Sequence, residues 1–282
     1  MNRNSIGYGF LTAALCTAGF VLVAGRPMRS PLQQIDLEHN GVHAPYNIHN
    51  PKGDLLFYNF RAVEPGVLYR GSGFPRNKWV DAEKKVRVAA FLDGQTFEFL
   101  RARGIRRIIR IQAPSDFKRT EDFYAEPGYF EYWSQKTGYK ITHETLPVRA
   151  GHAYDPDAKG LQKYPFEEQR SGLRAASDFI EIMKKHKASD GAIYFHCDAG
   201  KDRTGVVAAA YELWHNRGTA SPDTLWQQVM ERYLVSDALI KRDPEASKFA
   251  GDQGDCGDGT TGFVCRSWLE KLRPQLETIA QL

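Results

Sequence analysis

The sequence predicts a protein of the α/β class, with strands and helices alternating around one core. Residues 191–195 are apolar and β-prone, and a short polar stretch separates them from a helix-prone segment at 206–215. A second strand-like run at 104–111 follows a helix-like segment at 93–103. The chain has 282 residues, 42% of them hydrophobic and 26% charged, which suits one α/β domain with extensions. Its net charge of +4 is too small to argue for nucleic acid.

The N-terminal segment differs from the rest of the chain. Residues 6–25 contain no charged side chain, and a stretch of that length can span a bilayer. The small residues at 23–25 equally suit the cleavage site of a signal peptide. Residues 1–25 are therefore predicted to be a transmembrane anchor or a signal peptide, so the protein would be membrane-anchored or exported to the periplasm or the cell exterior. Residues 26–55 are rich in Pro, Asn, His and Gly and are predicted to be a linker or an extended arm.

Residues 56–282 are predicted to form the single folded domain, with a helical extension at its C-terminal end. A hairpin is expected near 59–75, and a lysine-rich insertion follows at 77–91. The aromatic-rich stretch 117–139 is expected either to pack on the domain as a helical lid or to form a substrate wall. Ser221 is expected to cap the helix that begins after it. The helices are predicted over 93–103, 166–187, 205–217, 221–233 and 268–282.

Cysteine and histidine usage gives little sign of a metal site. Cys256 and Cys265 bracket part of a Gly- and Asp-rich stretch. Outside the cytoplasm they can form a disulfide that closes this loop, whereas inside it they would be free thiols. The eight histidines are scattered and no two have HExxH spacing, so we expect no metal and no cofactor.

The most informative stretch is residues 196–205, which read His-Cys-Asp-Ala-Gly-Lys-Asp-Arg-Thr-Gly. A tight loop that leads into a helix presents backbone N–H groups and the positive end of the helix dipole to a phosphate. Gly200 allows a backbone conformation or a close approach that a side chain would hinder. The planar fork of Arg203 can grip two phosphate oxygens at once. The predicted phosphate-binding residues are Asp198, Ala199, Gly200, Lys201, Asp202 and Arg203.

Cys197 lies six positions before Arg203, where a nucleophile is expected. The amide donors, the helix start and the guanidinium all favour the thiolate, which is the nucleophilic form of cysteine. The Thr204 hydroxyl is placed to donate a further hydrogen bond to the sulfur. Attack on phosphorus would give a phosphocysteine that water hydrolyses in a second step, without a metal ion. A buried structural Cys197 is the alternative, but it leaves the Gly, Arg, Thr and Gly at fixed offsets unexplained.

The stretch His196-Cys197-x-x-Gly200-x-x-Arg203-Thr204-Gly205 resembles the signature of the protein tyrosine phosphatase superfamily of cysteine-dependent phosphatases. Residues 59–75 resemble the opening hairpin of atypical dual-specificity phosphatases, and residues 104–111 resemble the strand after their first helix. In that strand, Arg110 stands where such families usually carry Asn or Asp. The resemblance covers about residues 57–234. It implies a protein-tyrosine-phosphatase-like mixed central sheet flanked by helices, in a single catalytic domain.

Two sites compete for the general acid that must protonate the leaving oxygen. The loop pair Lys201-Asp202 resembles secreted bacterial phosphatases that act on phosphotyrosine, phosphoserine/threonine and phosphoinositides. Myotubularin lipid phosphatases also place an Asp just before the signature Arg, and in both groups this loop Asp is the proposed acid. Asp202 is therefore the first candidate. Most members of the superfamily instead take the acid from a separate upstream loop, where Asp155 and Asp157 flank a proline here.

The same resemblance implies that His196 supports the loop and the thiolate, and that Lys201 points into or near the pocket. The leading hypothesis for the substrate is phosphotyrosine in proteins, with dual specificity as a variant of it. A phosphoinositide or inositol phosphate is the second, favoured by Lys201, by the arginine-rich stretch 101–110 and by a membrane anchor. A phosphate-binding pseudophosphatase is the third, but it would be expected to lack Cys197 or Arg203.

Overall fold

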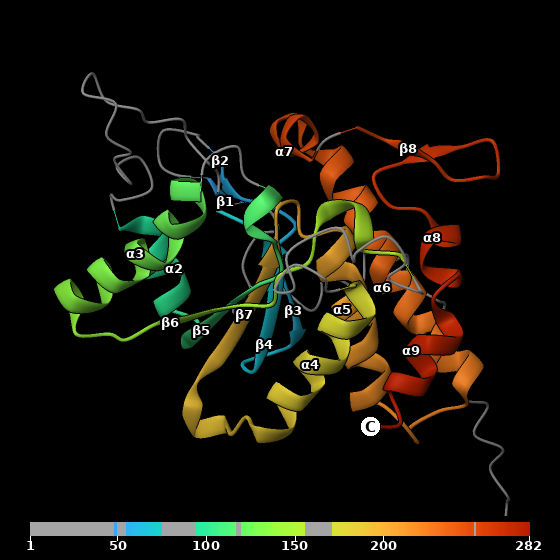
Figure 1. Cartoon of the computed structure of the whole chain (residues 1–282), viewed down its shortest axis with the longest axis horizontal. Coiled ribbons are helices and arrows are strands. Elements are labelled where there is room, and N and C mark those ends of the chain that lie inside the picture. Colours follow the sequence, from blue (N-terminus) through green and yellow to red (C-terminus); the bar gives the residue numbers. More distant parts are fainter. Residues whose placement is uncertain (1–47, 50–54, 75–93, 117–119, 156–170, 251) are drawn as a thin grey trace, which may run out of the picture.

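A five-stranded mixed sheet forms the centre of the fold (Figure 1). The computed structural model describes residues 48–49, 55–74, 94–116, 120–155, 171–250 and 252–282. The sheet has the order β3-β4-β7-β5-β6, and every neighbouring pair is parallel except β3 with β4. Its strands are β3 (Arg61–Glu64), β4 (Leu68–Ser72), β5 (Ile105–Arg110), β6 (Thr142–Thr145) and β7 (Ala192–Cys197).

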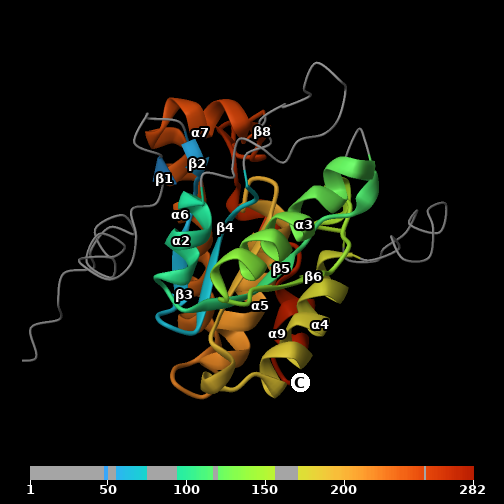
Figure 2. The same ribbon diagram turned by 90° about the vertical axis from the view of Figure 1, so that its left-hand side faces the viewer.

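Helices cover both faces of this sheet (Figures 1 and 2). On one face lie α2 (Gln95–Arg101) and α3 (Thr120–Thr137). On the other lie α4 (Gly172–Lys185) and α5 (Asp202–His215), with α6 (Pro222–Arg242) and α9 (Arg273–Ile279) packed against α5. This arrangement confirms the predicted fold class.

Two hydrophobic cores result from the alternation of side chains along the strands. On the central strand β7, Tyr194 belongs to the core beneath α2 and α3, whereas Phe195 and Cys197 belong to the core beneath α4 and α5. The side chain of His196 therefore lies on the opposite face of the sheet from that of Cys197.

The C-terminal extension begins after α6 and folds back over the carboxyl edge of the sheet. The disulfide Cys256–Cys265 closes a small hairpin of β8 and β9, with 5.1 Å between the two Cα atoms. Phe263 from this segment is buried in a third apolar cluster that also contains Ala199. The short elements of the molecule are β1 (Ile48–His49), β2 (Leu55–Phe57), η1 (Pro114–Asp116), η2 (Ala150–His152), η5 (Ala188–Asp190), α7 (Pro244–Phe249), β8 (Gly254–Asp255), β9 (Thr261–Gly262) and α8 (Arg266–Glu270).

Most of the predicted helices and strands are present, but some of them end at other residues than predicted. Ser221 caps α6, since its side chain accepts a hydrogen bond from the Thr224 amide, but the helix runs nine residues beyond the predicted end at Tyr233, to Arg242. The single terminal helix predicted over 268–282 is wrong. The chain forms α8 and α9 instead, because the ring of Pro274 would clash with the carbonyl of Glu270 in a continuous helix.

Several predictions fall on residues that the structure does not describe. These are the anchor or signal peptide at 1–25, most of the arm at 26–55, the insertion at 77–91, and Asp157. Within the described residues, no helix combines the length and the hydropathy that a bilayer crossing requires.

Candidate active site

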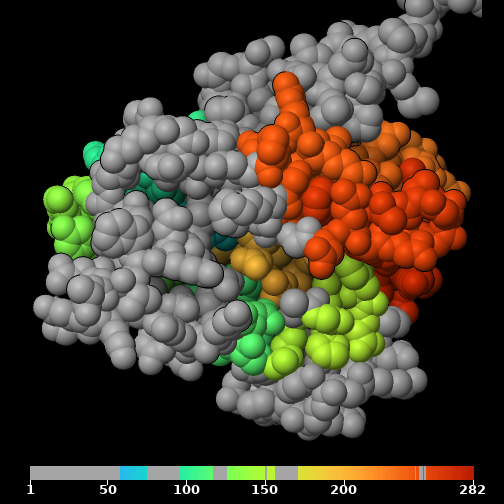
Figure 3. All heavy atoms as spheres, turned by 90° about the horizontal axis from the view of Figure 1, so that it is seen from above, coloured from blue at the N-terminus to red at the C-terminus, as the bar shows by residue number. Residues whose placement is uncertain are grey.

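Cys197 is the last residue of the central strand β7, and α5 begins five residues later at Asp202. Residues 197–203, which we call the Cys197 loop, lie at the carboxyl edge of the parallel strands, where sites of α/β proteins form. Figure 3 looks onto this edge, where the gold segment around residue 200 is recessed between the yellow-green η2 region and the red-orange C-terminal region. Cys197 is a free thiol and only 2% of its surface is exposed.

Two buried donors hold the carbonyl groups on the back of the Cys197 loop. The Asn59 side-chain amide donates to the carbonyl oxygens of Ala199 (3.3 Å) and Gly200 (2.9 Å). The Arg70 guanidinium, from β4, donates to the Gly200 carbonyl at 2.7 Å. In a trans peptide the N–H points opposite to the C=O, so the following amides of Gly200 and Lys201 face away from these donors. The loop therefore turns amide donors toward its open side, as a phosphate cradle requires.

Glycine is required at the closest contact between this loop and the sheet. Gly200 has a φ of +66°, in the left-handed region. A Cβ there would lie 2.2 Å from the carbonyl carbon and oxygen of Gly71, at the end of β4. A Cβ on Gly71 would in turn lie 2.5 Å from the Tyr194 hydroxyl. Neither residue has room for a side chain, so the loop packs directly on the backbone of β4.

Arg203, in the first turn of α5, is buried and already held in place. Its Nη1 donates to the Val148 carbonyl at 2.9 Å and forms an ion pair with Asp116, which ends η1. Burial lowers the pKa of the Arg203 guanidinium, but the charges of Cys197 and Asp116 outweigh burial and leave the pKa above its usual value. The arginine is thus a fixed cation beside the thiol.

Asp202 lies next to Arg203 and keeps 28% of its side chain exposed. The Tyr154 hydroxyl donates to its Oδ1 at 2.9 Å and lies 2.6 Å from the Tyr233 hydroxyl. Burial raises the pKa of Asp202, although the nearby charge of Lys201 and the Tyr154 hydrogen bond oppose the shift. Asp202 therefore holds a proton to a higher pH than an ordinary aspartate, while its carboxyl group still reaches solvent.

The other predicted site residues have more varied surroundings. The Lys201 ammonium donates to the Phe263 carbonyl at 3.0 Å, so it contacts the C-terminal extension. The Thr204 hydroxyl is buried without a hydrogen-bond partner among the described residues, so the expected donation to sulfur is not observed. Asp198 is exposed, and its carbonyl accepts from the Gly73 amide. Asp155, the alternative acid, lies 3.5 Å from the His152 ring.

His196 lies behind the Cys197 loop in a network that the sequence did not predict. Its Nε2 contacts Glu126 from α3, which also contacts His143 from β6. Atoms of these three residues that can ligate a metal lie within 4.8 Å of one another, close enough to bind one ion together. Both imidazoles instead contact the same carboxylate oxygen, and the Arg110 guanidinium lies 3.5 Å from the other. We therefore describe the group as a hydrogen-bonded network.

Several residues of the site were not predicted, and only some of them could have been recognised from the sequence. The hairpin resemblance included Asn59 and Arg70 without indicating what they contact. Asp116 lies six residues after the end of β5, and a polar residue beyond the carboxyl end of a parallel strand is a recognisable signal. Tyr154 and Glu126 left none.

Comparison with known proteins shows the family of the chain. The model of a tyrosine phosphatase family matches residues 57–253, so the chain belongs to that family. Among solved structures, a DUF442 protein from Shewanella putrefaciens CN-32 matches with 18% identity and a TM-score of 0.34, covering 62% of this chain and 92% of its own. The core catalytic domain of the PP-IP phosphatase SIW14 from S. cerevisiae, in complex with citrate, matches with 17% identity and a TM-score of 0.32, covering 68% and 90%. No curated protein matches the sequence.

Proposed function

We propose that the protein hydrolyses phosphotyrosine in proteins through a phosphocysteine intermediate, with Cys197 as the nucleophile. The observation that carries this proposal is the Cys197 loop itself. Asn59 and Arg70 bind the carbonyls of Ala199 and Gly200, so the amides that follow face away from these donors, and Arg203 lies close enough to Cys197 for their charges to interact. Such an arrangement binds a phosphate dianion and stabilises the charge that builds up on its oxygens during transfer.

The chemistry has two steps. The Cys197 thiolate attacks phosphorus, the bond from phosphorus to the tyrosine oxygen breaks, and Asp202 gives its proton to that oxygen. Water then attacks the phosphocysteine, the P–S bond breaks, and Asp202 takes a proton from the water. Arg203 holds two phosphate oxygens throughout, on the side where Asp116 and Val148 fix its position.

The raised pKa of Asp202 gives this mechanism a definite pH dependence. Burial raises the pKa, so the acid stays protonated to a higher pH than a solvent-exposed aspartate. The turnover number should fall as the pH rises through that pKa, because the unprotonated form cannot assist the leaving group. Asp202→Asn should lower kcat by about 100-fold and remove this basic limb. If the limb persists in Asp202→Asn, the acid lies elsewhere, with Asp155 the next candidate.

The surroundings of the Cys197 loop support a phosphotyrosine substrate over a polyphosphate. Aromatic side chains stand beside the loop, since Tyr154 contacts Asp202 and its ring lies 5.6 Å from that of Trp268. The Lys201 ammonium, on which the inositide hypothesis depended, donates to the Phe263 carbonyl. Each arginine of the stretch 101–110 already contacts another side chain of the protein. The pairs are Arg101 with Glu98, Arg103 with Phe99, Arg106 with Tyr139, Arg107 with Glu144, and Arg110 with Glu126.

The test is phosphate release by the full chain, with Cys197→Ser as the blank. The panel holds phosphotyrosine and phosphothreonine peptides, phosphoinositides and soluble inositol polyphosphates. We expect Cys197-dependent turnover of the phosphotyrosine peptides, with at least a ~10⁴-fold loss in Cys197→Ser. Selective turnover of inositides would replace the proposed substrate. No turnover of any substrate, with phosphopeptide binding retained by Cys197→Ser, would identify a binding protein instead.

A further inference from the structure

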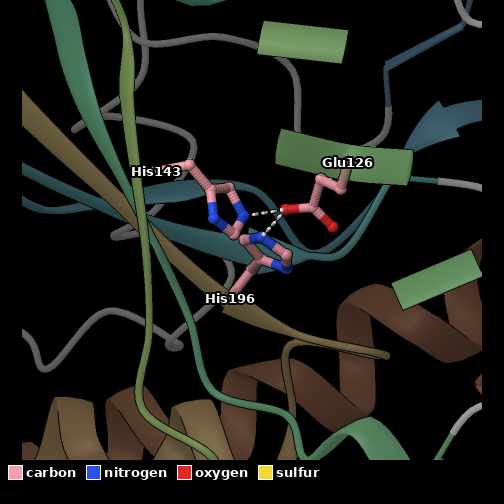
Figure 4. Close-up of side chains that lie close together, drawn as sticks. All are labelled: Glu126, His143 and His196. Atoms are coloured by element: carbon pink, nitrogen blue, oxygen red, sulfur yellow. Dashed lines mark hydrogen bonds and ion pairs between the residues drawn. The ribbon is translucent and has the colours of Figure 1, made fainter. Parts of the chain in front are cut away.

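Glu126 joins α3 to the two strands β6 and β7 behind the Cys197 loop (Figure 4). One oxygen of its carboxylate, Oε1, lies 2.8 Å from Nε2 of His196 and 2.9 Å from Nε2 of His143. His196 is fully buried, and its other ring nitrogen, Nδ1, lies 3.0 Å from the carbonyl oxygen of Cys197. The ring thus spans the distance between the Glu126 carboxylate and the backbone of the residue that bears the thiol.

The hydrogen-bond partners of His196 define how many protons it carries. A carbonyl oxygen can only accept, so Nδ1 must carry a proton to bond with Cys197. An ionised carboxylate can also only accept, so Nε2 must carry a second proton to bond with Glu126. Burial raises the pKa of Glu126, but the charge of His196 and the hydrogen bonds from His143 and His196 outweigh burial and hold the pKa well below its usual range. With Glu126 ionised, both contacts are satisfied only by a doubly protonated, cationic His196.

Other charged and titratable groups face Glu126 and His196 from β5, β6 and β7. Arg110 of β5 is fully buried with its Nη1 3.5 Å from the second oxygen of Glu126, and His143 reaches it from β6. On β7, Tyr194 stacks on the His196 ring and donates its hydroxyl to the Ser72 carbonyl, and burial raises its pKa well above the usual range. Arg110 and the imidazolium carry two positive charges, and Glu126 carries one negative charge. The thiolate of Cys197 supplies the remaining negative charge.

We propose that Glu126 is a positioning residue that keeps His196 doubly protonated, so that the imidazolium stabilises the Cys197 thiolate from behind the loop. The proposal rests on the proposed function of Cys197 as a nucleophile. The Nδ1 proton fixes the ring on the Cys197 carbonyl, and the carboxylate of Glu126 holds the charge of the ring where it acts on the strand end. Glu126 does not touch the reacting atoms.

The experiment follows the rate of Cys197 alkylation by iodoacetamide against pH in the full chain, with the rate of Cys197→Ser subtracted to remove the other thiols. In Glu126→Gln the imidazolium loses its counter-charge and gives up a proton. We expect the midpoint of alkylation, and the acidic limb of kcat/KM, to move to higher pH by about one unit. One unit below the wild-type midpoint, alkylation should slow about tenfold. Glu126→Asp keeps the carboxylate, so its midpoint should stay close to that of the wild type.

The matched control is Glu131→Gln, on the exposed side of the same helix α3, where the side chain of Glu131 accepts a hydrogen bond from Gln135. It should leave both profiles unchanged. A uniform loss of kcat/KM in Glu126→Gln without a shifted midpoint would mean that Glu126 only supports the fold, which would overturn the proposal. One equivalent of metal in the purified wild type that is lost in Glu126→Gln would also overturn it. Because alkylation needs no substrate, a shift with no turnover in the wild type would refute the proposed function alone.

Discussion

The two sides of the Cys197 loop are held by different kinds of interaction. On the sheet side, Asn59 and Arg70 donate hydrogen bonds to buried carbonyls of the loop. On the C-terminal side, Phe263 packs in one apolar cluster with Ala199 and accepts a hydrogen bond from Lys201. The first set fixes the direction in which each peptide group of the loop faces. The second set covers the loop without determining that direction.

The sheet side is itself braced by a buried polar network. Arg61 donates hydrogen bonds to the backbone carbonyl of Asn59 at 3.2 Å and to the side-chain oxygen of the same residue. It also donates a hydrogen bond to the Ser236 hydroxyl of α6 at 2.9 Å. Asn59 has a φ of 56°, a left-handed conformation that asparagine tolerates better than most residues. A satisfied buried network of this kind selects one geometry. We therefore expect catalysis to depend far more on the sheet side than on the C-terminal side.

Among changes on the two sides of the loop, Arg70→Met is expected to lower kcat/KM the most. Methionine occupies a similar volume but cannot donate, so the Gly200 carbonyl loses its charge-assisted partner. We expect kcat/KM on a phosphotyrosine peptide to fall about 100-fold, and the free energy of unfolding in urea to fall by about 2 kcal/mol. The matched control is Arg101→Met, which removes an exposed arginine paired with Glu98 and should change neither quantity. Wild-type kinetics in Arg70→Met would show that the peptide groups keep their direction without this donor.

A smaller effect on activity is expected when the C-terminal side is loosened. Cys256→Ser combined with Cys265→Ser removes the disulfide, which closes a short loop and should stabilise the protein by about 2–3 kcal/mol. We expect kcat/KM to fall less than about tenfold, since Phe263 only covers the loop. Thermal unfolding and steady-state kinetics measure the two effects.

A reducing agent provides the control for the disulfide experiment. It should reproduce the loss of stability in the wild type and leave the double variant unchanged. If the double variant loses as much activity as Arg70→Met, the C-terminal segment also determines the geometry of the loop, and the distinction between the two sides fails.

The sequence predicted the parts of this site that depend on neighbours along the chain. The strand–loop–helix at β7 and α5, the need for Gly200 and the Ser221 cap all follow from local signals. Pro274 is also a local signal, but one helix was predicted over 268–282 in spite of it, and the chain forms two. The mixed sheet came from the family resemblance.

Partners that are distant in sequence could not be predicted in the same way. Asn59 and Gly200 are 141 positions apart, and Glu126 and His196 are 70 apart, so no spacing rule connects them. Arg110 was the one clue to the network around Glu126, because it stands where related families usually carry Asn or Asp. Its guanidinium lies against Glu126, so the departure from the family pattern marks the network behind the loop. The residue that such an unusual side chain contacts can be identified only from the folded structure.

The smallest effect is expected for Lys201→Met, and its direction separates the two roles open to this residue. Lys201 lies 3.7 Å from the Asp202 carboxylate, and its charge opposes the rise that burial imposes on the pKa of Asp202. Without that charge the pKa should rise further, so the basic limb of kcat should move to higher pH while kcat/KM changes less than about threefold. The measurement is the pH profile of kcat on a phosphotyrosine peptide. A larger loss with an unmoved limb would mean that the ammonium holds phosphate, as the sequence predicted, and that the contact with Phe263 gives way when substrate binds.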